Sequence, residues 1–442
     1  MNGHRMNVEA RRQGRAMVLL VAGILPIGCA NSQAPWPQFG GPDRNFMVTA
    51  PPLADHWPEQ GPPVLWSRDL GDGYATIVSD GDALYTMYRL GPDEITVALD
   101  ADTGVTRWEH KNPAPPTPLM EQFGPGPHAS PVLAGGRLFT IGTNAVLHCF
   151  DKRTGKVLWR HDLPAEFKAP IPGRGFACSP IAFENLLILP VDRERPDPQG
   201  GQPAVEEAKA DDDVARQQSL MAFDQKTGDV AWSRHDYPVS YASPVLIRHA
   251  DQTQLVVLLE RELIGLNPRD GELLWHEPFE PEGTNLASPL WTGDDLLFCS
   301  SAYDSGSRTI KLTRDGTGTV PTQLWYSRKM RIHHANAVRI GDYVYGSSGD
   351  FGPAFFMGLN IHTGEVAWRE RGFAKATCLL ADGKLILLDE DGQLALATAT
   401  PQGFTVHSKC KIAERYAWAA PTLVGSTLYV RDRKKIMALD LG

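Results

Sequence analysis

Eight residues occupy the same place in a short phrase that recurs along the chain, and their types suit ligand binding. The phrase is a variable residue followed by Ala or Cys, a small residue and often Pro. The variable residues are Tyr74, His128, Ala177, Tyr241, Leu286, His334, Lys375 and Trp418. Aromatic rings stack on planar ligands, and cations form charge-assisted hydrogen bonds to anions. We therefore predict a site for a small planar or anionic ligand, built from Tyr74, His128, Tyr241, His334, Lys375 and Trp418.

Four more residues lie near this phrase in the sequence and could add to the same site. They are Arg174, His333, Arg415 and Tyr416. The alternative interpretation is that large side chains only fill a hole in the middle of the fold, without binding anything.

No motif in the sequence supplies catalytic or metal-binding residues. There is no Cys-x-x-Cys, no adjacent pair of cysteines, no Gly-rich phosphate loop, no Gly-x-Ser-x-Gly and no His-Glu-x-x-His. Catalytic residues therefore stay unassigned, and no metal ligands are predicted. The cysteines at 149, 178, 299, 378 and 410 are expected to be small buried hydrophobic residues, although a disulfide pair stays open.

A second repeated phrase describes the strands that must position these side chains. It runs from an apolar strand through Asp or Asn to a Gly four residues later and a Trp four residues after that, for example from Asp100 through Gly104 to Trp108. Asp or Asn bonds the backbone ahead of it, and Gly takes the positive φ of a tight turn, so the phrase predicts a β-hairpin. The repeated Trp159, Trp232 and Trp368 are expected to be largely buried between neighbouring units.

The number of repeats predicts the architecture. The first phrase occurs eight times, and each copy is followed by a turn and further apolar strands. Four strands in a unit of roughly 40–50 residues is typical of a propeller blade. The last unit ends at Leu439-Asp440 without Gly or Trp, and an unpaired Trp strand stands at Pro63 to Trp66. We expect an all-β, eight-bladed β-propeller of four-stranded antiparallel blades, closed by an N-terminal strand that completes the C-terminal blade. An open solenoid is the alternative.

These residues resemble the PQQ-like β-propeller repeat family, which is the quinoprotein type of propeller. Residues 98–108 and 150–159 are similar to its blade signature, and residues 36–45 are similar to the N-terminal segment of BamB-like envelope propellers. The family mixes quinoprotein dehydrogenases with non-enzymatic scaffolds, so the resemblance implies the fold and leaves the activity open. In the dehydrogenases it would imply PQQ held by Ca²⁺, an Asp base and often an adjacent Cys pair. This chain has no such Cys pair.

The composition limits the partners. The chain has 442 residues and a net charge of -9, and no basic stripe is available to neutralise phosphates. This argues against nucleic acid as a partner. We expect a monomer that meets a membrane only through a lipid anchor.

The N-terminus resembles an export signal. Arg11, Arg12 and Arg15 precede an apolar run over 16–28 that is too short to span a bilayer. Cys29 follows Gly28, as at a bacterial lipoprotein cleavage site, so we predict a lipoprotein-like signal peptide over 1–29 and lipidation of Cys29. Simple cleavage near Ala30, with release to the periplasm, is the alternative. The predicted location is the periplasm or cell envelope, and the outer membrane if Cys29 is acylated.

The remaining chain divides into an N-terminal extension over 30–62 and the propeller over 63–442. A polar insertion over 192–218 interrupts the propeller and contains the acidic run Asp211 to Asp213. Its low hydrophobicity predicts a mobile loop between the second and third strands of its blade. The loop is either decorative or a lid or partner contact over the central channel.

Two classes of function follow. The first is an exported, non-enzymatic β-propeller that acts as a protein- or ligand-binding scaffold in the bacterial cell envelope, without a cofactor and with envelope proteins as partners. The alternative is a quinoprotein dehydrogenase that uses PQQ and Ca²⁺ and acts on alcohols or sugars.

Overall fold

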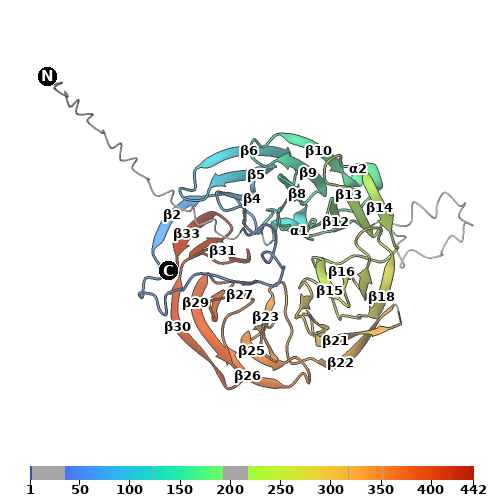
Figure 1. Ribbon diagram of the computed structural model, residues 1–442, viewed down its shortest axis with the longest axis vertical. Helices are drawn as coiled ribbons and strands as arrows, with labels where there is room; N and C mark the ends of the chain where they lie inside the picture. Colours follow the sequence, from blue (N-terminus) through green and yellow to red (C-terminus); the bar gives the residue numbers. More distant parts are fainter. Residues whose placement is uncertain (2–34, 123, 193–217, 317, 351) are drawn as a thin grey trace, which may run out of the picture. The chain divides into compact units, whose positions relative to one another are not determined.

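The repeated phrases fold into eight antiparallel sheets that surround a central channel (Figure 1). The computed structural model describes residues 1, 35–122, 124–192, 218–316, 318–350 and 352–442. All eight sheets belong to Gln33–Gly442, one of the two compact units into which the chain divides. This confirms the predicted eight-bladed propeller of four-stranded blades.

The blades follow one another along the chain, and each runs from an inner to an outer strand (Figure 1). The strands of blades 1 to 4 are β3 (Val78–Ser79), β4 (Ala83–Leu90), β5 (Asp93–Asp100), β6 (Thr106–Pro113), β7 (Val132–Ala134), β8 (Arg137–Ile141), β9 (Val146–Asp151), β10 (Val157–Asp162), β11 (Ile181–Phe183), β12 (Leu186–Pro190), β13 (Leu220–Asp224), β14 (Val230–Arg234), β15 (Val245–His249), β16 (Gln252–Leu258), β17 (Glu262–Leu266) and β18 (Leu273–Pro278). The strands of blades 5 to 8 are β19 (Leu290–Trp291), β20 (Leu296–Ser301), β21 (Gly306–Asp315), β22 (Gly318–Ser327), β23 (Ala337–Ile340), β24 (Tyr343–Ser348), β25 (Phe355–Asn360), β26 (Val366–Arg371), β27 (Thr377–Ala381), β28 (Lys384–Leu388), β29 (Gln393–Thr400), β30 (Gly403–Lys411), β31 (Thr422–Val424), β32 (Thr427–Arg431), β33 (Lys435–Asp440) and β2 (Val64–Asp69). Short helices α1 (Pro118–Glu121) and α2 (Leu163–Phe167) lie in the connections after blades 1 and 2.

The ring closes through the two ends of the propeller sequence. Strand β2 is the outer strand of blade 8 and pairs antiparallel with β33, with Val64 opposite Leu439 and Trp66 opposite Ala438. The N-terminal strand therefore completes the C-terminal blade, as the sequence predicts, and an open solenoid is excluded. Closure pairs both ends of the propeller sequence within one sheet and leaves no terminal blade exposed.

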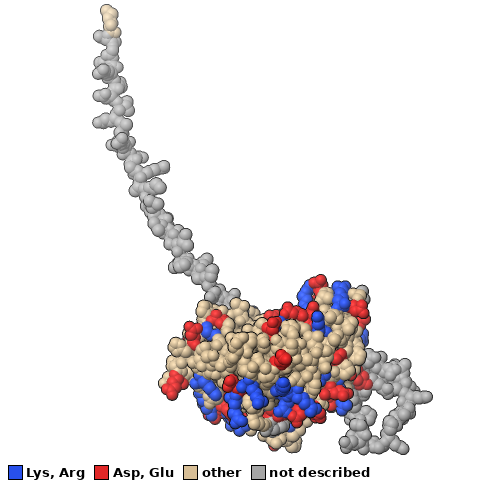
Figure 2. All heavy atoms as spheres, turned by 90° about the horizontal axis from the view of Figure 1, so that it is seen from below, with Lys and Arg blue, Asp and Glu red and all other residues tan. Residues whose placement is uncertain are grey.

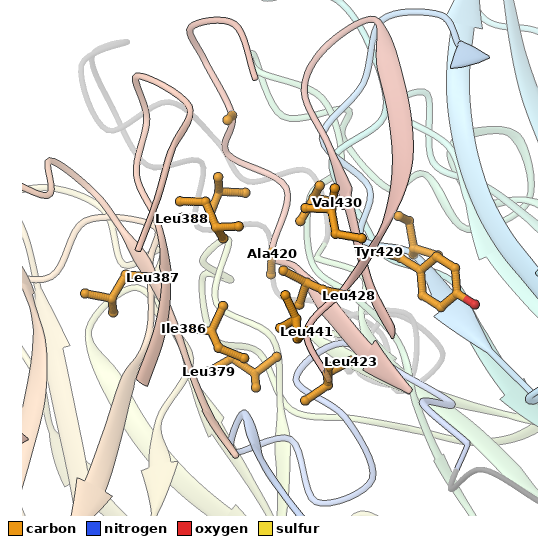
Figure 3. Packing of buried hydrophobic residues seen from close by; sticks show 14 of the residues in the cluster. Leu379, Ile386, Leu387, Leu388, Ala420, Leu423, Leu428, Tyr429, Val430 and Leu441 are labelled. Atoms are coloured by element: carbon orange, nitrogen blue, oxygen red, sulfur yellow. The ribbon is translucent and has the colours of Figure 1, made fainter. Parts of the chain in front are cut away.

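Apolar side chains fill the space between adjacent blades. Figure 3 shows Leu379 and Ile386 of blade 7 pointing toward Leu423 and Leu428 of blade 8, and all four belong to one buried cluster. Both faces of an inner strand are covered by neighbouring blades, which explains why such strands are almost continuously apolar.

The repeated Trp is a contact between blades. The indole of Trp108 in blade 1 lies against Gly155 in blade 2, where an added Cβ would be 2.6 Å from the ring. Its Nε1 donates a hydrogen bond to the carbonyl oxygen of Lys152, at 2.9 Å. Gly155 also has a φ of +71°, so this turn requires Gly both for its backbone and for the approach of the ring. The same contact recurs for Trp66, Trp159, Trp232 and Trp325 on the next blade.

The repeated Trp residues differ in how far they are buried. Trp232 is 5% exposed, as expected. Trp159 and Trp368 are partly buried, and each donates a hydrogen bond to the next blade. Trp275 has a different hydrogen-bond partner. Its Nε1 donates to Gln254 Oε1 within its own blade, at 2.7 Å, and not to the next blade.

The five described cysteines are buried and free, which confirms that they behave as small hydrophobic residues. Burial raises the pKa of the Cys178 thiol to about 12, so this thiol is protonated and unreactive at neutral pH.

The N-terminal extension is part of the ring. Trp36 forms a bridge with Ser79 of blade 1, and the Pro37 carbonyl oxygen accepts from Leu133 N of blade 2, at 2.8 Å. Strand β1 (Met47–Val48) then pairs in parallel with β27 of blade 7. The segment 36–48, here called the channel segment, thus crosses the central channel from blade 1 to blade 7 (Figure 1).

Two predicted features fall outside the described residues. The signal peptide over 1–29, with Cys29, lies there apart from Met1, and so does most of the insertion over 192–218. The ends of that insertion are placed as predicted, after β12 and before β13. In the described residues no helix is long and apolar enough to cross a membrane.

Candidate functional site

All eight variable residues of the first repeated phrase line one cavity at the centre of the ring. The cavity has a volume of about 360 Å³, and the four neighbouring candidates Arg174, His333, Arg415 and Tyr416 line it too. We call it the channel cavity. The structure thus brings every predicted site residue together, while their role in ligand binding stays a prediction.

A belt of serine hydroxyls explains why these positions converge. Ser130 Oγ accepts from Thr76 N of the preceding blade at 3.1 Å, and Ser179 Oγ accepts from Ser130 N at 2.9 Å. Ser243 and Ser288 continue the pattern, at 2.9 and 3.2 Å. These four hydrogen bonds link the phrases of blades 1 to 5, and there the variable residue two positions earlier is held at the cavity wall.

The channel segment reaches the cavity. Phe39 and Phe46 meet edge to face there, with ring centroids 5.1 Å apart. The Arg44 guanidinium donates to the carbonyl oxygens of Pro244, at 2.7 Å, and of Pro180. Burial lowers the pKa of Arg44 to about 10, so it remains charged at neutral pH. The channel segment therefore forms part of the cavity wall.

Aromatic rings form much of the wall. Tyr74 stacks on His128 with centroids 5.2 Å apart and an interplanar angle of 15°. Trp418 contacts Tyr74, His334 and Tyr416 at 5.2, 4.8 and 4.7 Å between ring centroids. Stacking of a flat ligand on these rings stays a prediction.

Sequence reasoning missed one residue of this site, Glu390. Its side chain is 8% exposed. Oε2 accepts from Lys375 Nζ at 3.1 Å and from Trp418 Nε1 at 3.2 Å. Arg415 lies 3.6 Å from Oε1. Glu390 belongs to the turn after β28, which joins the second and third strands of its blade. The insertion over 192–218 joins the second and third strands of blade 3 in the same way. The place of Glu390 in this type of turn was therefore a signal in the sequence that could have marked it as a site residue.

The histidines of the wall are neutral. Burial lowers the pKa of His128 and of His333 to about 4, and it lowers the pKa of His334 well below its usual value. His333 shares hydrogen bonds with Tyr303 at 2.9 Å and with His334 at 2.8 Å. The positive charge of the wall therefore comes from lysine and arginine.

Cations outnumber carboxylates around the cavity. The cationic lining residues are Arg44, Arg174, Lys375 and Arg415. Among the described lining residues, Glu390 is the one carboxylate. A cavity with this balance attracts anions and repels cationic ligands.

The lining does not fit a quinone held by Ca²⁺. Calcium takes about six to eight oxygen ligands, commonly with carboxylates among them. Glu390 already accepts from Lys375 and Trp418. Over the described ranges, no three His, Cys, Asp or Glu side chains are grouped so that they could hold a metal ion.

Figure 2 shows the rim of the propeller, where both acidic and basic side chains are exposed and several basic side chains gather along the lower side.

Comparisons with known proteins agree with this architecture. A family model described as "Outer membrane protein assembly factor BamB" matches residues 92–370. No curated protein matches the chain.

Solved structures share the fold at low sequence identity. The quinohemoprotein alcohol dehydrogenase ADHIIG from Pseudomonas putida HK5 is 12% identical, with a TM-score of 0.60, and the match covers 92% of this chain and 80% of that one. The quinohemoprotein alcohol dehydrogenase from Comamonas testosteroni is 14% identical, with a TM-score of 0.51 and coverage of 93% and 82%. The computationally designed Ika8 protein is 10% identical, with a TM-score of 0.54 and coverage of 84% and 98%. At these identities the likeness shows the fold alone.

Proposed function

Because the chain belongs to the family whose model is described as outer membrane protein assembly factor BamB, we propose that it is an exported, non-enzymatic β-propeller. It acts as a binding scaffold in the bacterial cell envelope, as a monomer. Its partners are envelope proteins, and the channel cavity holds a small planar or anionic ligand.

The pairing of Glu390 carries the proposal. A general base has to be within reach of the proton that it takes and has to accept it. The one carboxylate of the described cavity wall instead accepts hydrogen bonds from Lys375 and Trp418, with Arg415 beside it. This supports a cavity that binds a ligand and changes nothing in it.

Titration with PQQ and Ca²⁺ tests the absence of quinoprotein chemistry. PQQ is itself a planar anion, so a rise in the melting temperature of the full chain would show only that it binds, and turnover is the readout that decides. We expect no dye reduction with alcohols or sugars. An established quinoprotein dehydrogenase, treated in parallel with the same PQQ, serves as the control.

The opposite result would favour the dehydrogenase. Dye-linked oxidation of an alcohol or sugar by the protein with PQQ, lost in Lys375→Ala, would overturn the scaffold proposal. Lys375 is the informative residue because it supplies a cation at the cavity wall.

Fractionation of cells tests lipidation of Cys29. We expect the wild type in the membrane fraction and Cys29→Ala in the soluble periplasmic fraction, because acyl chains supply the anchoring. Cys410→Ala is the matched control, since Cys410 is buried within β30 and the variant should stay with the membrane. A soluble wild type would show that the signal is cleaved without lipidation.

A further inference from the structure

Lys375 differs from the other seven variable residues of the cavity wall in its backbone. All eight lie in the described part of the chain, and of these only Lys375 has a positive φ, +47°. A non-glycine residue in this region is uncommon and persists only where its surroundings hold it there. The backbone at this position is therefore constrained in a way that its counterparts are not.

The ammonium of Lys375, the carboxylate of Glu390 and the indole of Trp418 meet at one point of the wall. Lys375 Nζ lies 3.1 Å from Glu390 Oε2 and 5.9 Å from the centroid of the Trp418 ring. Trp418 Nε1 donates to the same carboxylate oxygen, at 3.2 Å. A carboxylate here thus receives one charge-assisted hydrogen bond and one indole hydrogen bond.

Glu390 has a second partner, which would remain if Lys375 were taken by another anion. Arg415 lies 3.6 Å from Glu390 Oε1 and 3.4 Å from Asp391 Oδ1. Release of Lys375 would therefore not leave the Glu390 carboxylate buried without a cation. Because the wall holds more cations than carboxylates, a second carboxylate is tolerated next to Glu390.

We propose that Glu390 is an internal substitute for the carboxylate of the ligand, and that an aromatic carboxylate binds by replacing it at Lys375 and Trp418. This inference rests on the proposed function, because it concerns the ligand of the same cavity. The ring of the ligand stacks on the wall beside Tyr74 and Trp418, and its carboxylate takes the two hydrogen bonds that Glu390 gives up. The cavity volume of about 360 Å³ restricts the ligand to a small molecule.

A pair of probes separates charge from ring stacking. 1-Naphthoate carries the carboxylate, and 1-naphthamide presents the same rings without charge. Binding of both probes to the full chain is measured by calorimetry and by fluorescence for the wild type, Lys375→Met, Glu390→Gln and Lys152→Met. Lys152 is the matched control, because it forms a similar ion pair with Asp80, at 2.6 Å, away from the cavity.

The two cavity variants should change naphthoate affinity in opposite directions. Lys375→Met should weaken it roughly ten- to hundredfold, because a hydrogen bond to a charged group is lost. Glu390→Gln should tighten it about tenfold, because the internal competitor loses its charge. Naphthamide should respond to neither change by more than about twofold, and Lys152→Met should leave both probes unaffected. Lys375→Arg keeps the cation and should therefore retain much of the naphthoate binding. It also provides a test of Lys375 if Lys375→Met fails to fold.

The outcomes separate this inference from the proposed function. If the wild type binds naphthoate and Glu390→Gln binds it no more tightly, Glu390 is not a substitute, and the binding function still stands. If neither the wild type nor Glu390→Gln binds either probe, both the inference and the cavity as a ligand site are wrong. If Lys375→Met weakens both probes equally, the residue shapes the cavity and does not recognise charge, which also overturns the inference.

Discussion

Deletion of residues 434–442 is expected to abolish the folded ring. It removes β33, which lies between β2 and β32 in blade 8. Strand β2 would lose its partner, β32 would gain an open edge, and the fully buried Ile436, Leu439 and Leu441 would be lost. Open edges of this kind promote association between chains. We expect aggregation in size-exclusion chromatography and loss of a cooperative thermal transition.

Lys435→Gln is the matched control for this deletion. Lys435 is exposed and lies at the start of the same strand, so its substitution should leave the transition unchanged. A deletion variant that stays soluble, monomeric and cooperative would show that pairing of β2 with β33 is not needed for the fold.

Trp232→Ala is expected to lower the free energy of unfolding by about 3–5 kcal/mol, the usual cost of truncating a buried Trp. Trp232 lies against Gly271 of the next blade and donates to the carbonyl oxygen of Pro268, at 3.2 Å. The substitution leaves a cavity between blades 3 and 4 and removes this hydrogen bond. Denaturant titration measures this loss of unfolding free energy. The m-value, which is the slope of that free energy against denaturant concentration, should be unchanged.

Trp368→Ala is the comparison that tests the explanation. Trp368 donates a similar hydrogen bond to the next blade, to Thr400 O at 2.7 Å, but it is only partly buried. Trp368→Ala should therefore lower the free energy of unfolding clearly less than Trp232→Ala does. If the two variants lose equal stability, burial between blades is not what makes Trp232 important. Naphthoate affinity should be unchanged in Trp232→Ala, because this residue lies on the outer strand β14.

The contacts between blades and the lining of the channel cavity come from different positions of the same repeats. The Gly and Trp of the hairpin phrase hold blades together near their outer strands, and the serine belt holds the inner strands together. The variable residue before each inner strand lines the channel cavity and differs in type from blade to blade. This division explains how one ring can serve proteins with unrelated activities.

The sequence by itself determined the architecture and the position of the site. Asp or Asn and Gly at fixed spacing set a hairpin through local backbone preferences, which need no distant partner. The number of repeats and the unpaired strand at each end then determined the closed ring of eight. Equivalent residues of equivalent blades must lie at equivalent places around the axis, so Tyr74, His128, Lys375 and Trp418 converge on the same cavity.

Only the tertiary structure decided what these residues contact. Glu390 reaches Lys375 and Trp418 from a turn outside the repeated phrases, and Arg44 reaches the Pro244 carbonyl oxygen across 200 residues of sequence. Such contacts depend on where whole blades lie, and neither spacing nor periodicity encodes them. The partial burial of Trp159 and Trp368 has the same cause, since exposure on an outer strand depends on how much of the ring the next blade covers.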